Sequence, residues 1–231
     1  MIQRIAVAIA LTLAPAALAQ TYIVPDGNCG AITLHATSGT DFPYLGETVG
    51  ADRVKDAYLY LPKQRVAVKP AAGRRSLDFN ANIPDDFVVM ATVDFTPVVS
   101  GNETRTEHAK AFIFCGATAP AADWQRETGL GLEIIPQSWN GRRPQLKPGD
   151  SMRFIAVHRA TKLQLIGDLP MELYRAGAGR IAGGVPDQCG GMDFPYPEPG
   201  RYMVTTTYRR PDPQQPEHWL VDTSTLTFEI K

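Results

Sequence analysis

The chain has 231 residues, with 23 Lys and Arg against 24 Asp and Glu, so its formal net charge is -1. A nearly neutral chain lacks the basic face that nucleic-acid binding requires, and we predict no nucleic-acid partner. The 19 prolines and 20 glycines are spread evenly along the chain, which favours turns between ordered elements over a disordered protein. The length fits one large domain or two small ones.

The N-terminus has the three parts of a secretory signal peptide in order. Arg4 supplies positive charge, Ile5–Ala14 is apolar, and Ala17-Leu18-Ala19 is a small-residue cleavage site before Gln20. The apolar run is about half as long as a membrane-spanning helix needs to be. We therefore predict that residues 1–19 are cleaved and that the mature chain is periplasmic or secreted and does not span a membrane. Losing one arginine and no acid changes the formal charge from -1 to -2.

Three cysteines in an oxidising compartment allow one disulfide, with three pairings. We predict a bond between Cys29 and Cys115, because closing so long a loop contributes about 4 kcal/mol in the chain-entropy model. Cys189 then lies outside this bond. With no CxxC motif and no histidine near it, a buried or incidental Cys189 is favoured over a metal ligand or a redox site.

Alternating apolar and polar residues dominate the mature chain and predict an all-β fold. In the last segment, Leu226, Phe228 and Ile230 would lie on one face of a strand. Turn signals such as Pro148-Gly149 separate the predicted strands. These strands are Ile32–Ala36, Asp56–Leu61, Phe87–Phe95, Ala109–Cys115, Gly131–Ile135, Met152–His158, Met171–Tyr174, Tyr202–Tyr208 and Leu226–Ile230.

Many short strands separated by turns predict β-sandwiches, since a half-buried sheet needs a second sheet over its apolar face. The Ala-rich and Pro-containing segment after Cys115 suggests a boundary. We predict two immunoglobulin-like sandwiches, residues 20–118 and 130–231, joined by a linker at residues 119–129. One continuous sandwich is the alternative.

Several motifs of the second half occur in a recognisable order: Leu130–Pro136, Leu146–Asp150, Met152–His158 and Pro199–Tyr202. This order resembles an uncharacterised family of bacterial periplasmic proteins, some of which are described as accessory components of nickel uptake. The resemblance implies a transthyretin-like or carboxypeptidase-regulatory-like C-terminal sandwich, a membrane transporter or outer-membrane receptor as partner, and a divalent transition metal. Members often begin the mature chain with histidine, whereas this chain has Gln20 there.

The four histidines are far apart in sequence, so a site that combines them would have to be assembled by the fold. His35 is the best candidate metal ligand, because Asp41 and Glu47 follow closely and could supply oxygen ligands. For His158 we predict partial burial with a hydrogen bond, since it shares a strand face with apolar residues. His108 follows the charged residue Glu107 just before a predicted strand, and we predict that it is exposed to solvent.

Catalytic motifs are scarce: the sequence has no Gly-x-Ser-x-Gly elbow, no His-Glu-x-x-His helix and no phosphate-cradling glycine loop. The leading hypothesis is an exported, non-catalytic periplasmic binding or accessory module linked to transition-metal uptake, with nickel as the metal that the resemblance suggests. The alternatives are a carbohydrate-active or other periplasmic hydrolase and a structural partner of an outer-membrane receptor.

Overall fold

The computed structural model describes residues 19–28, 30–61, 64–82, 88–114, 125–137, 149–159, 163–164, 169–196 and 198–230. Their regular structure consists of strands and one 3-10 turn, η1 (Ala51–Arg53), which confirms the all-β prediction. Within these ranges, no helix has the length and apolarity to cross a membrane. Cys29, Cys115 and almost all of the predicted signal peptide lie outside the described residues.

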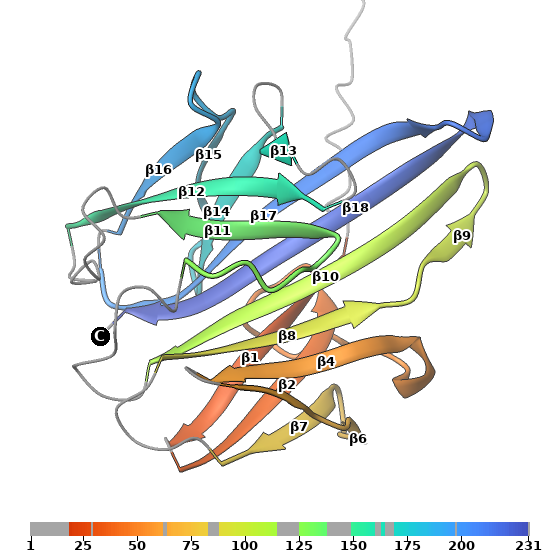
Figure 1. The fold of residues 1–231 in the computed structure, drawn as a ribbon. Helices are drawn as coiled ribbons and strands as arrows, with labels where there is room; N and C mark the ends of the chain where they lie inside the picture. The colour runs from red at the N-terminus through yellow and green to blue at the C-terminus, as the bar shows by residue number, and fades with distance from the viewer. Residues whose placement is uncertain are drawn as a thin grey trace, which may run out of the picture.

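The described strands form three sheets (Figure 1). The first sheet contains β1 (Gln20–Asn28), β2 (Ala31–Gly39), β3 (Glu47–Thr48), β6 (Ala71–Ala72) and β7 (Leu77–Ala81). The third sheet contains β11 (Leu132–Gln137), β12 (Ser151–His158), β13 (Leu163–Gln164) and β16 (Gly191–Pro195). The central sheet contains β4 (Val54–Leu61), β5 (Gln64–Ala67), β8 (Val88–Phe95), β9 (Val98–Ser100), β10 (Glu103–Phe114), β14 (Met171–Arg175), β15 (Gly179–Gly184), β17 (Gly200–Asp212) and β18 (Gln215–Ile230).

The central sheet takes strands from both halves of the chain. Its two halves meet where β10 pairs in parallel with β18, from Glu103 opposite Trp219 to Ala111 opposite Thr227. Figure 1 shows these two long strands side by side across the molecule. A parallel pair needs a long connection, and here the connection includes the whole third sheet and the β14–β17 segment. The sequence did not predict this shared sheet.

Side-chain alternation along β10 gives the central sheet two buried faces. Ala109, Ala111 and Ile113 pack with residues of the first sheet, whereas Phe112 packs with residues of the third sheet. The first of these clusters is drawn from residues 23–113, and the second is drawn mostly from residues 132–230. Each half therefore contributes most of one hydrophobic core, while one sheet serves both.

The predicted linker at residues 119–129 is described only from residue 125 onward, where Arg126, Glu127 and Gly129 are exposed. Thr128 is buried, and its backbone carbonyl accepts a hydrogen bond of 2.7 Å from the Tyr60 hydroxyl. The end of this segment is thereby held against β4 of the central sheet.

Candidate functional site

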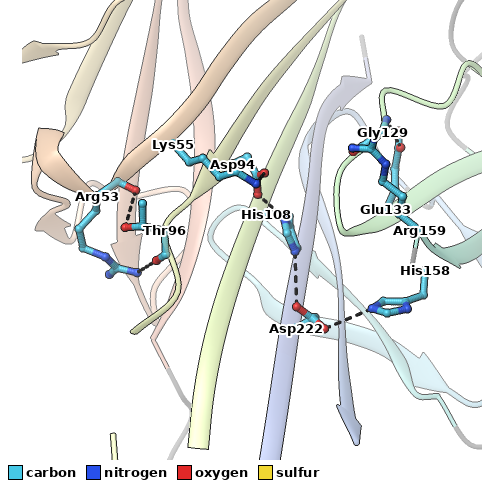
Figure 2. Close-up of polar contacts among 10 residues, drawn as sticks. All are labelled: Arg53, Lys55, Asp94, Thr96, His108, Gly129, Glu133, His158, Arg159 and Asp222. Carbon is cyan, nitrogen blue, oxygen red and sulfur yellow. Dashed lines mark hydrogen bonds and ion pairs between the residues drawn. The ribbon is translucent and has the colours of Figure 1, made fainter. Parts of the chain in front are cut away.

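Four ionisable side chains, which we call the buried network, lie one after another between the central and third sheets (Figure 2). The central sheet supplies Asp94 from β8, His108 from β10 and Asp222 from β18, and the third sheet supplies His158 from β12. His108 Nδ1 lies 2.7 Å from Asp94 Oδ1, and its Nε2 lies 3.7 Å from Asp222 Oδ1. The second distance is an ion-pair separation beyond hydrogen-bond range. His158 Nε2 lies 3.3 Å from Asp222 Oδ2, which completes the buried network.

Burial disfavours the charged forms of these four side chains, and opposite charges within the buried network act against this cost. The His108 side chain is 3% exposed. Burial alone would lower its pKa, but the hydrogen bond with Asp94 and the negative charges of Asp94 and Asp222 outweigh this, so the His108 pKa is raised. Burial likewise acts to raise the pKa values of Asp94 and Asp222, yet His108 and neighbouring cations lower both. The group therefore favours a charged imidazole between two carboxylates.

Further cations and an aromatic ring contact the buried network. Lys55 Nζ lies 3.3 Å from Asp94 Oδ2, and Arg210 Nη2 lies 3.9 Å from Asp222 Oδ2. The His158 ring meets Tyr208 edge-on, with 5.1 Å between centroids. Burial, aided by Arg210, lowers the pKa of His158 despite the opposing charge of Asp222. His158 is thus the neutral imidazole of the pair.

The prediction for His158 is confirmed, because it is buried and hydrogen-bonded. The prediction that His108 is solvated is wrong. Its ring is covered by the backbone of Gly131, where an added Cβ would come within 2.7 Å of the ring. The glycine that precedes β11 lets the third sheet approach the imidazole closely, which a local sequence pattern around His108 does not reveal.

A second interior ion pair joins the same two sheets. Lys110 Nζ lies 2.5 Å from Glu133 Oε1, and the two side chains are 1% and 3% exposed. Glu133 also accepts hydrogen bonds from the backbone N–H groups of Thr128 and Gly129. Burial lowers the pKa of Lys110 against the opposing charge of Glu133. The pair fixes β11 and residues 128–129 to the central sheet.

The surface histidine environment is on the first sheet. His35 on β2 has Nδ1 2.7 Å from Asp78 Oδ1 on β7, and its Nε2 lies 4.0 Å from Asp26 Oδ2 on β1. Ser76 donates a hydrogen bond of 2.6 Å to Asp78 Oδ1, which holds this carboxylate from a second direction. The His35 side chain is 19% exposed, and that of Asp26 is 70% exposed. Solvent and ions can reach this imidazole.

The two predicted oxygen ligands, Asp41 and Glu47, have other surroundings. Asp41 follows β2, and its backbone carbonyl accepts the Tyr44 N–H. Glu47 lies on β3 opposite Ser38, and its carbonyl accepts a hydrogen bond from Thr37. The contacts described for His35 are instead with Asp78, Ser76 and Asp26. Across the described ranges, no three His, Cys, Asp or Glu side chains form a group that could hold a metal ion.

Ser76, His35 and Asp78 are the residue types of a hydrolase triad, but their geometry differs from one. Ser76 Oγ and Asp78 Oδ1 both lie near Nδ1 of His35, at 3.3 and 2.7 Å. A triad places the nucleophile and the carboxylate on opposite ring nitrogens, so that the imidazole can relay a proton between them. Here the serine donates its proton to the carboxylate instead. This group orients an imidazole and does not activate a nucleophile.

Cys189 is exposed in the turn before β16. Its backbone N–H donates to the carboxylate of Asp187, which also accepts from the Gly191 N–H and from the guanidinium of Arg153. The hydrogen bond from Arg153 is the main cause of the lowered pKa of Asp187. The buried arginine thus fixes the backbone that presents Cys189.

No model of a known protein family matches this chain, and no curated protein matches its sequence. The geometry itself separates the two histidine environments. In the buried network of Asp94, His108, Asp222 and His158, the imidazoles and the carboxylates face one another. At the surface, His35 presents one ring nitrogen toward an exposed carboxylate, which is an arrangement suited to binding a cation.

Proposed function

We propose that the mature chain is an exported, non-catalytic binding or accessory protein of the periplasm that serves transition-metal uptake. The observation that carries this proposal is the surface histidine environment, in which Asp78 orients an accessible imidazole beside Asp26. Imidazole and carboxylate groups are established ligands of divalent transition metals. The family resemblance adds nickel as the metal and a membrane transporter or outer-membrane receptor as the recipient.

The burial of these four side chains supports a non-catalytic role for the buried network. The His108 side chain is 3% exposed, and it lies between the carboxylates of Asp94 and Asp222, which are 15% and 12% exposed. Because breaking a buried ion pair is strongly destabilising, we assign these residues to the association of the sheets. The accessible His35 is then the imidazole that can meet a ligand.

Metal binding is tested with the protein comprising residues 20–231. Equilibrium dialysis against Ni²⁺, Co²⁺, Zn²⁺ and Cu²⁺, one at a time, should give saturable binding of at least one of them with a Kd below about 100 μM. Weaker binding of all four ions would overturn the metal-linked function.

Export is tested separately, by expressing the full chain in a bacterium and fractionating the cells. The protein recovered from the periplasm should be shortened and should begin at Gln20, as the cleavage site predicts. Retention of an intact N-terminus in the cytoplasm would contradict the exported state.

A further inference from the structure

We propose that His35 Nε2 and Asp26 Oδ2 together bind one divalent transition-metal ion, and that Asp78 acts as the positioning residue. This inference rests on the proposed function and adds to it a place, two ligand atoms and a supporting group. The three residues come from neighbouring strands of the first sheet, since Asp26 lies on β1, His35 on β2 and Asp78 on β7.

Asp78 determines which nitrogen of His35 faces outward. A carboxylate can only accept a hydrogen bond, so the 2.7 Å contact makes Nδ1 of His35 the donor. In the neutral imidazole, Nε2 then carries the lone pair. A carboxylate on the far nitrogen is the arrangement that orients metal-binding histidines and increases their basicity.

Asp26 is oriented in a comparable way on the opposite side. Its Oδ1 accepts the N–H of Gly27 at 2.9 Å, which leaves Oδ2 directed toward Nε2 of His35 at 4.0 Å. Gly27 has φ of +104°, and an added Cβ would meet the Ala31 carbonyl at 2.6 Å, so glycine is required at this position of β1. The backbone near the end of β1 thus aims one carboxylate oxygen at the imidazole.

The result is a pair of electron-rich atoms that face each other without a hydrogen bond between them. Two such atoms repel unless a positive charge lies between them. With metal bonds of about 2.1 Å, two ligand atoms of an octahedral or tetrahedral ion lie about 3.0–3.4 Å apart. The separation of 4.0 Å is therefore slightly too long, and Oδ2 has to move closer to Nε2, which the exposed Asp26 side chain has room to do.

The site offers two protein ligands and an open side. Because no group of three metal-ligating side chains is found among the described residues, the remaining coordination positions would be filled by water or by a partner protein. An open site of this kind suits an ion that is to be passed on, whereas closed four-ligand sites hold structural metals.

The test is the dialysis titration with Ni²⁺ and Cu²⁺, repeated on single variants of the mature chain. His35→Ala should weaken binding by at least about 100-fold, and Asp26→Asn and Asp78→Asn each by about 10-fold. His218→Ala is the matched control, because His218 Nε2 lies 2.8 Å from the Thr104 hydroxyl rather than beside an acid. This variant should bind like the wild type.

Electron paramagnetic resonance of the Cu²⁺-loaded protein supplies a readout that lost stability would not produce. Wild type and Asp78→Asn should both show hyperfine coupling to imidazole nitrogen, which Asp26→Asn retains and His35→Ala loses. Wild-type affinity in His35→Ala or Asp26→Asn, or loss of binding in His218→Ala, would overturn the assignment while leaving the proposed function standing. A wild-type chain that binds none of the metals overturns both.

Discussion

His35 and His108 make the same first contact but lie in opposite surroundings, one near the surface and one buried. Each has Nδ1 2.7 Å from an aspartate Oδ1, on Asp78 and Asp94 respectively. The second nitrogen of His35 faces Asp26, which is 70% exposed, whereas that of His108 faces Asp222, which is 12% exposed. The depth of the second carboxylate, and not the first contact, therefore separates the exposed histidine environment from the buried one.

The physical reason is the cost of removing charge from water. Between the sheets, an unpaired carboxylate or imidazolium is strongly unfavourable, so each partner depends on the others. At the surface, solvent screens the same pair and its contribution to folding is small. Substitutions in the two regions should therefore differ in their effects on stability.

The largest loss is expected for the interior pair of Lys110 and Glu133. Glu133→Ala leaves a fully buried ammonium without its partner and should reduce the free energy of unfolding by about 3–5 kcal/mol. Urea denaturation at pH 7 measures this change. The double variant Lys110→Met, Glu133→Leu should recover part of the loss, and a double variant less stable than Glu133→Ala would contradict this account of the pair.

A smaller but clear loss is expected for His108→Gln. The substitution removes the cation that lies between Asp94 and Asp222 and should cost about 2–3 kcal/mol in the same urea experiment. A change below about 0.5 kcal/mol would mean that the buried network does not hold the sheets together.

The contribution of His108 should also depend on pH, with a sign fixed by the pKa directions. Its raised pKa means that its stabilising effect is fully present below the usual value of 6.5 and is lost as pH rises through the folded-state pKa. The lowered pKa values of Asp94 and Asp222 mean that their effect is lost as pH falls below 3.8. The difference in unfolding free energy between wild type and His108→Gln should therefore be greatest between about pH 4 and 6.5.

The lowered pKa of His158 acts in the opposite direction, since the unfolded chain takes up this proton more readily as pH falls below 6.5. His158 is present in both proteins, so its effect largely cancels in the difference. A difference that grows from pH 6 to pH 9 would contradict the assigned charge of His108.

The smallest effect on stability is expected at the surface. His35→Ala should change the unfolding free energy by less than about 1 kcal/mol, because solvent screens the contacts of this side chain. A metal-free comparison of wild type and variant by urea denaturation measures the change. A loss as large as that for His108→Gln would remove the distinction between the two regions.

Local pattern predicted nine strands, but it missed β1 and β7, although each carries buried apolar side chains such as Ile23 and Phe79. The segment Leu226–Ile230 is the end of β18, and all nine predicted strands coincide with observed ones within the described residues. The pattern underestimated the length of β17 and β18. No position of β17 from 209 to 212 is buried, and the missed part of β18, residues 215–225, includes the buried polar side chains of Asp222, Ser224 and Thr225, which carry no hydrophobic signal. It missed β5, whose four residues are all exposed. Edge strands carry little hydrophobic signal.

Long-range placement could not be predicted in the same way. The pairing of β10 with β18 joins residues more than a hundred positions apart, and no local spacing encodes it. For the same reason, the sequence led to His35 but paired it with Asp41 and Glu47, which are near in sequence. Asp78 reaches the imidazole from a strand 43 positions away.

The most direct test of the contrast is to observe the four imidazoles at once. In ¹⁵N-detected ring spectra of the mature chain, sub-stoichiometric Ni²⁺ should broaden the His35 signals first and leave His108 and His158 sharp. Because the broadening falls steeply with distance from the ion, it reports position as well as binding. Selective broadening of His35 is the predicted result. Earlier broadening of His108, His158 or His218, or no broadening of any ring, would contradict the account.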